Sequence, residues 1–168
     1  MDDAGTLDPG QCQYEAWASR TGTEPATRGL HIGPACRVGP LEVGLSVDRL
    51  AVRGERSVNF AGPQLKWTFF GQGANAPLAA ALSASATFDI TRGGRAGGQV
   101  MVPVTWRALD NVQLHANLGA DWALGSGAHG AQAEWAVGER VSLIAERNRA
   151  FDQWTSRVGV RFSLTPLA

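Results

Sequence analysis

The stretch VQLHANLGADW, residues 112–122, alternates apolar and polar side chains without a break. Successive side chains of a β-strand point to opposite faces, so this stretch predicts a strand with one apolar and one polar face. The same period of two recurs from about Gln11 to Leu164, for example in LEVGLSVD, residues 41–48. Almost none of the chain has the period of an amphipathic helix. The sequence therefore predicts an all-β protein.

Ten alternating stretches follow one another, separated by turn residues. We expect strands at residues 11–20, 29–38, 41–52, 61–70, 77–91, 98–109, 111–124, 130–138, 140–149 and 153–164. Short connections are expected at Gly39-Pro40, Leu109-Asp110-Asn111 and Gly138-Glu139-Arg140, with a medium turn over 72–76. Longer polar connections are expected at 21–28, 53–60, 92–97, 125–129 and 150–152. Alternation of short and long connections is typical of outer-membrane barrels, in which the short turns lie in the periplasm.

The predicted fold is therefore an antiparallel up-and-down transmembrane β-barrel of about ten strands in the bacterial outer membrane. We expect residues 1–10 to form an N-terminal periplasmic tail, 11–164 the β-barrel and 165–168 a C-terminal tail. Closure of the ten strands into one barrel should direct Leu45, Leu65, Val104, Leu118 and Val160 outward.

Composition narrows the function classes. The 168 residues are enough for one domain and have a formal net charge of +0, so nothing points to nucleic acid. No run approaches the 18 apolar residues of a membrane helix. The start Met1-Asp2-Asp3 has neither the basic residues nor the apolar segment of a signal peptide. A cytosolic protein is one interpretation; we favour a mature exported chain with an added initiator Met, since the strands need a membrane.

Alternation alone does not say which face points inward. A soluble, lipocalin-like barrel encloses its apolar face around a ligand, whereas a membrane barrel turns that face toward lipid. The alternating connections favour lipid, and so do the aromatic residues, because membrane barrels gather them in two interfacial girdles. One predicted girdle, near the short turns, holds Trp67, Phe69, Trp106, Trp135 and Phe162; the other holds Phe88, Trp122 and Trp154.

The two cysteines, Cys12 and Cys36, fall on consecutive predicted strands at similar distances from a loop centred near Glu24. Both lie on the apolar face, so a hairpin would place them opposite each other, with Cα atoms about 4.4–6.8 Å apart if they are bonded. A cross-strand disulfide fits an oxidising periplasm, and two buried free thiols are the alternative.

Four pieces of the chain resemble a known group of proteins. They are GQCQYEAW (10–17), GPAC (33–36), LHANLG (114–119) and VGVRF (158–162). Together they resemble uncharacterised proteobacterial outer-membrane β-barrel proteins, which are loosely similar to the proposed outer-membrane transporters of phenol-degradation clusters. The resemblance spans most of the chain, but these motifs mostly encode strands and turns. Outer-membrane barrels usually end in Phe or Trp, whereas this chain ends in Leu167-Ala168. Truncation before a final hairpin would make the parent barrel twelve-stranded.

By the same alternation, charged side chains and two histidines line the predicted lumen. The lumen-lining set is Glu15, Arg37, Glu42, Asp48, Lys66, Asp89, Arg107, His115, Asp121, Glu134, Glu146, Arg157 and Arg161, joined by His31. One hypothesis is a narrow channel or transporter for small solutes, in which these charges form a constriction. The alternative is a non-conducting structural or interaction barrel, whose lumen is closed by salt bridges between them. The mixed signs argue against strong ion selectivity.

Enzymatic chemistry has little support in the sequence. A Ser-His-acid esterase needs a Ser near a His that a carboxylate orients, but His115 is followed by Asn117 and not by Ser. An omptin-like protease would need Asp and His pairs at the rim, where His129 and Asp121 are the nearest candidates. No Cys/His cluster has metal-ligand spacing and no Gly-rich phosphate loop follows a strand, so we expect no metal and no cofactor.

The expected partners follow from the predicted location in the outer membrane. They are outer-membrane lipid and lipopolysaccharide, the barrel-assembly machinery and possible small solutes, with the chain itself a monomer.

Overall fold

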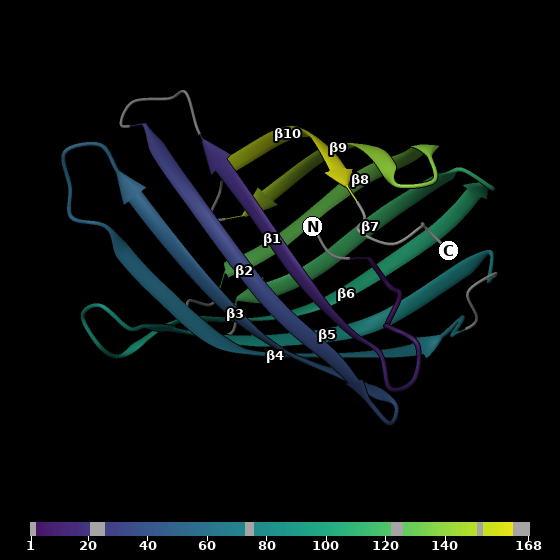
Figure 1. The fold of residues 1–168 in the computed structure, drawn as a ribbon, viewed down its shortest axis with the longest axis horizontal. Helices are drawn as coiled ribbons and strands as arrows, with labels where there is room; N and C mark the ends of the chain where they lie inside the picture. Colours follow the sequence, from purple (N-terminus) through teal and green to yellow (C-terminus); the bar gives the residue numbers. More distant parts are fainter. Residues whose placement is uncertain (1–2, 21–25, 73–75, 122–125, 151–152, 163–168) are drawn as a thin grey trace.

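The computed structural model is a strongly curved antiparallel sheet of ten strands, each hydrogen-bonded to the next in sequence (Figure 1). It describes residues 3–20, 26–72, 76–121, 126–150 and 153–162. The strands are β1 (Cys12–Arg20), β2 (Thr27–Val38), β3 (Leu41–Val52), β4 (Val58–Phe70), β5 (Leu78–Asp89), β6 (Arg95–Leu109), β7 (Val112–Asp121), β8 (Ser126–Gly138), β9 (Val141–Ala150) and β10 (Gln153–Phe162).

The all-β, up-and-down topology predicted from the alternation is confirmed, with the same number and order of strands. Most strand ends differ from the expected ones by a few residues. The connection between β9 and β10 is shorter than expected, because only residues 151–152 separate the two strands. Trp122 and the expected 165–168 tail lie outside the described residues. Among the described residues there is no helix long and apolar enough to cross a membrane.

The alternating side chains separate into a convex apolar face and a concave polar face. Leu45, Leu65, Leu118 and Val160 are exposed on the convex face, and Val104 is half-buried there. The buried polar residues, among them Thr105, lie at the alternate strand positions and so face the inside of the curve. The curved sheet therefore encloses polar side chains and exposes apolar ones, the reverse of a soluble ligand-binding barrel.

The sheet stays open between its two edge strands. In the part of the chain that the structure describes, no ladder joins β1 to β10, although we expected ten strands to close into one barrel. The two edge strands cross in Figure 1 and do not run side by side. Ladder pairing needs strands about 4.8 Å apart along their length, and the described parts of β1 and β10 form no such ladder. The described residues therefore form a half-barrel.

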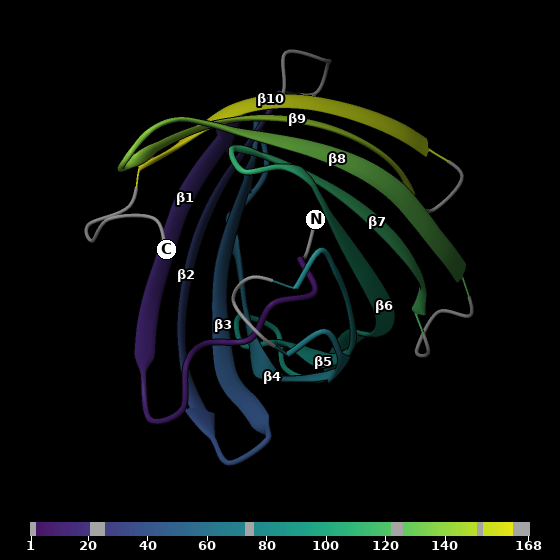
Figure 2. The ribbon, with the colours of Figure 1, turned by 90° about the vertical axis from the view of Figure 1, so that its right-hand side faces the viewer.

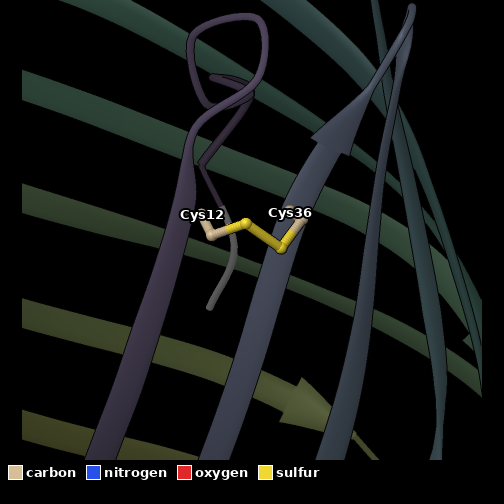
Figure 3. Close-up of a disulfide and its surroundings, with 2 residues drawn as sticks. All are labelled: Cys12 and Cys36. Atoms are coloured by element: carbon tan, nitrogen blue, oxygen red, sulfur yellow. A yellow bond between two sulfur atoms is a disulfide. The ribbon is translucent and has the colours of Figure 1, made fainter.

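A disulfide joins the first two strands, which confirms the cross-strand pair predicted from the sequence. Cys12 lies directly opposite Cys36 in the β1–β2 ladder, and their sulfur atoms are bonded (Figure 3). The Cα atoms are 4.0 Å apart, slightly closer than the expected range. The backbone bond from Arg37 N to Gln11 O shows why: the neighbouring residues make the ladder bonds. Non-hydrogen-bonded pairs of this kind have the shortest Cα separations in antiparallel sheets.

Loss of this disulfide should destabilise the protein. Replacing both Cys12 and Cys36 by Ser releases a loop closed over a sequence separation of 24 residues. The chain-entropy relation gives a loss of about 3.5 kcal/mol for a loop of this size. Urea unfolding in detergent micelles measures it, with the oxidised parent as the control. Equal unfolding free energies for the two proteins would contradict the prediction.

The exposed convex face should prevent folding in plain buffer. Its apolar residues form a continuous band over many strands, far beyond the isolated exposed side chains of a soluble monomer. We expect a folded, monodisperse species only in detergent or lipid, as measured by circular dichroism and size-exclusion chromatography with and without micelles. A folded, monodisperse protein in plain buffer would contradict the membrane interpretation.

Candidate functional site

The concave face carries polar side chains that are almost fully enclosed. His31, Thr68, Thr105, His115 and Glu134 each expose 9% or less of their surface. Buried polar groups are costly unless they find partners. These side chains come from β2, β4, β6, β7 and β8, which makes the concave face the candidate site.

An N-terminal segment, residues 3–7, lies within the curve of the sheet against this face (Figure 2). Ala4 is fully buried there. Its amide donates a hydrogen bond of 2.8 Å to Thr105 Oγ1, and its carbonyl accepts one of 2.7 Å from Thr68 Oγ1. The segment is thus fixed by backbone hydrogen bonds to β4 and β6.

Three of the predicted lumen residues hold the same segment. Arg37 Nη1 donates to Leu7 O at 2.7 Å, and Leu7 N donates to Glu42 Oε2 at 2.9 Å. Lys66 Nζ lies 3.2 Å from Asp3 Oδ1. Charged side chains from β2, β3 and β4 therefore bind the N-terminal segment at both of its ends.

Asp3 is held in its ionised form. Burial by itself would raise the pKa of the Asp3 carboxyl. Attraction to the Lys66 ammonium and hydrogen bonds from Lys66 and the Gly5 amide outweigh burial, so the pKa lies below its ordinary value of 3.8. The ion pair with Lys66 therefore stabilises the docked segment fully above the ordinary pKa of 3.8. This stabilisation is lost as the pH falls through the lowered pKa of Asp3.

A second group of predicted lumen residues surrounds His115. His115 Nδ1 lies 2.9 Å from Thr105 Oγ1, and His115 Nε2 lies 4.0 Å from Glu134 Oε2. Arg161 Nη1 donates to both oxygens of Glu134, at 2.9 and 3.2 Å. This group joins β6, β7, β8 and β10 across the concave face, and it reaches the N-terminal segment through Thr105.

Two further pairs lie on the same face. Arg157 Nη1 is 3.2 Å from Glu146 Oε1, which links β10 to β9. His31 Nδ1 is 2.7 Å from Asp48 Oδ1, which links β2 to β3. The Trp17 ring stacks on His31 with centroids 4.9 Å apart, so Trp17 also points inward from β1.

The other four predicted lumen residues also fall at concave-face positions of the ladders, but they have different surroundings. Asp89 ends β5, and its Oδ1 accepts bonds from the amides of Thr91 and Arg92, so it caps the following turn. Glu15 is exposed on the edge strand β1. Arg107 and Asp121 lie in β6 and β7 opposite Gln113 and Gln99, respectively.

Sequence reasoning missed the N-terminal segment and its two threonine partners. Thr68 and Thr105 sit at inward positions of predicted strands, but a lone Thr gives no signal of a contact. Residues 3–7 have no alternating pattern, so nothing in them pointed to a segment docked on the sheet. Within the described ranges, no group of three or more His, Cys, Asp or Glu side chains has the arrangement of a metal site.

Comparison with known proteins gives a family and a fold. The profile of the family described as "Uncharacterised conserved protein UCP029691" matches residues 1–164. The chain belongs to this family. No protein of curated function matches the chain significantly.

Two solved structures share its fold. One, described as "KdgM porin in complex with disordered oligogalacturonate", superposes with a TM-score of 0.64 at 13% identity over 92% of this chain and 93% of the other. A second, described as "KdgM porin", has a TM-score of 0.59 at 11% identity, with the same coverage of both chains. The described half-barrel therefore has a porin-like β-barrel fold. A proteobacterial source and a relation to phenol-degradation clusters stay predictions.

Neutralising Asp3 should release the N-terminal segment. In Asp3→Asn the attraction to Lys66 is lost, so the amides of Ala4 and Leu7 should exchange hydrogen for deuterium faster at neutral pH. Lowering the pH of the parent protein through the lowered pKa of Asp3 should have the same effect, after correction for intrinsic exchange rates. Mass spectrometry of the N-terminal peptide measures both.

Asp8→Asn is the matched control, because Asp8 belongs to the same stretch of chain but is exposed. It should leave the exchange unchanged. Equal exchange in Asp3→Asn and the parent would show that the backbone bonds hold the segment without the ion pair.

Proposed function

We propose that the protein is a β-barrel of the bacterial outer membrane that forms a narrow channel for small polar solutes. One observation carries this proposal: the sheet encloses charged and polar side chains and exposes an apolar band, in a porin-like fold. Lipid favours the apolar band, and a polar solute needs the enclosed polar face. A soluble protein would gain nothing from this arrangement.

A membrane requires that every backbone group on the sheet has a partner, so the edges β1 and β10 must be closed there. Closure by a further hairpin, giving twelve strands, is one hypothesis, and closure of the ten strands on each other is the other. Phe88 and Trp154, exposed at the ends of their strands, fit one interfacial aromatic girdle, and Trp67, Trp106 and Trp135 fit the other. These features support insertion into a bilayer.

The charges on the concave face favour weak selectivity. Arg37, Lys66, Arg157 and Arg161 are set against Glu42, Asp48, Glu134 and Glu146, so neither sign dominates. One porin of similar fold is described in complex with oligogalacturonate, a polyanion, but likeness of fold does not carry that ligand to this chain. The mixed lumen fits small neutral or zwitterionic solutes better than a strongly charged chain.

The second candidate is a non-conducting structural or interaction barrel. The docked N-terminal segment and the ion pairs of Glu134 and Glu146 favour it, because both occupy the space that a solute would need. Buried ions retain partners because an unpaired charge is costly in a low-dielectric interior. The two candidates therefore differ in whether the segment leaves the lumen.

We infer that the protein is not an enzyme. The hydroxyl of Thr105 lies within hydrogen-bond distance of the imidazole of His115, and it already accepts a hydrogen bond from the Ala4 amide. A hydroxyl covered by the N-terminal segment is poorly placed to attack a substrate. The partners proposed from the sequence, namely lipid, lipopolysaccharide and the barrel-assembly machinery, follow from the proposed location, with the chain acting as a monomer.

Conductance in planar bilayers tests the channel. We expect small, flickering currents from the unmodified chain and currents several-fold larger after deletion of residues 3–7, because the lumen is then unblocked. Arg157→Gln should also increase the leak, since it leaves Glu146 without its arginine. Arg49→Gln is the control, because Arg49 is exposed on the convex face.

Absence of current from both the parent and the deletion variant, in bilayers into which the protein has inserted, would favour the non-conducting barrel. Large, steady currents from the unmodified chain would instead mean that the segment does not block the path.

A further inference from the structure

The convex face is hollowed where it runs over the second half of the sheet. A groove of about 610 Å³ lies over β6 to β10. A row of paired residues crosses it from strand to strand: Trp106, Leu114, Ala133, Ala145 and Val158. The two alanines lie between larger neighbours, so the hollow runs along β8 and β9. Its volume falls within the range of about 300–1,000 Å³ that is usual for ligand sites.

A cation lies at one end of this groove. Arg147 follows Ala145 on the same face of β9, is exposed, and lines the groove. Its guanidinium lies 4.9 Å from the centroid of the Trp154 ring. The His129 ring also contacts Trp154 in an edge-on arrangement, with its centroid 5.5 Å from that of Trp154. Arg147 is therefore held in place beside the apolar groove.

Two further charged residues, Glu146 and Arg157, line the groove, but they belong to the concave-face positions and pair with each other at 3.2 Å. Arg149 and His129 form the next cross-strand pair along β9 and β8. At the convex-face positions of β7, β8, β9 and β10, the described sequence contains no Asp or Glu. An arginine at the border of an apolar surface is stabilised by binding an external anion. Its planar guanidinium can donate two parallel hydrogen bonds to a phosphate. Groove and cation together therefore fit an amphiphile with an acyl chain and a phosphate.

We propose that this groove binds one acyl chain of lipid A, the phosphorylated glycolipid anchor of lipopolysaccharide, with Arg147 on a lipid A phosphate. The choice of lipid A rests on the proposed outer-membrane function. Arg147 lies toward the β9–β10 connection at 151–152, on the same side of the sheet as the connections at 21–26 and 53–57. In the proposed topology that side is extracellular, so Arg147 faces the leaflet that contains lipopolysaccharide.

Binding of purified lipid A to the full chain in detergent micelles tests the proposal. Native mass spectrometry of the complex should show binding of lipid A that carries its phosphates, and weaker binding of the same lipid after enzymatic removal of the phosphates. Arg147→Gln should weaken binding of the phosphorylated form about tenfold, the order expected for loss of a charge-assisted hydrogen bond. Arg147→Lys should restore part of the affinity. Ala133→Leu fills the groove and should weaken both forms.

Two matched controls lie elsewhere on the convex face. Arg49→Gln removes an exposed arginine from β3, and Ala16→Leu enlarges an exposed alanine on β1. Neither should change lipid A binding. Equal binding of the two lipid A forms, equal weakening by Arg49→Gln, or equally strong binding of phosphatidylglycerol would overturn the proposal.

Conductance separates this inference from the proposed function. Arg147→Gln should conduct like the parent, because Arg147 lies outside the lumen. Unchanged conductance together with unchanged lipid A affinity would reject the lipid site and leave the channel intact.

Discussion

The hydrogen-bond ladder between strands that are neighbours in sequence is the constraint on which the whole structure depends. Each ladder fixes which residues stand opposite each other, and thereby which face every side chain joins. His31 pairs with Asp48 and Ile32 with Val47, so one pair lies inside the curve and the next outside. A slip by one residue would exchange the two faces and bury the apolar row against charged groups. The register and the separation of faces are therefore one property.

Enclosure of the polar face sets a second requirement, which the N-terminal segment helps to meet. Thr68, Thr105 and Glu42 would otherwise offer polar atoms to an enclosed space without backbone partners. The segment supplies an amide or a carbonyl to each of them. Any solute that uses the same groups must compete with the segment for them. Stability of the docked state and openness of the lumen are thus opposed, which links the packing of residues 3–7 directly to the proposed channel.

Alternation in the sequence was enough to predict the strands, their order and the two faces, because period two is a local property of each strand. It also predicted Cys12 opposite Cys36, since a hairpin leaves little choice of partner once its loop is located. It did not predict the docking of residues 3–7, whose contacts lie as much as 101 positions away in the sequence. Alternation placed Asp89 in the lumen but gave no sign that its carboxylate also caps the turn after β5. The open edge between β1 and β10 also escaped prediction, because closure depends on twist summed over the whole sheet.

The position of the disulfide has a consequence for assembly of the sheet. β1 is an edge strand of the described sheet, and an unpaired edge is a template for pairing with any other chain. The bond between Cys12 and Cys36 prevents the first hairpin from unzipping at that end and allows it a single alignment. In an oxidising compartment, this hairpin enters biogenesis with its register already set. β3 then pairs with a strand whose alignment is covalently defined, so the disulfide sets the starting register from which the rest of the sheet is built.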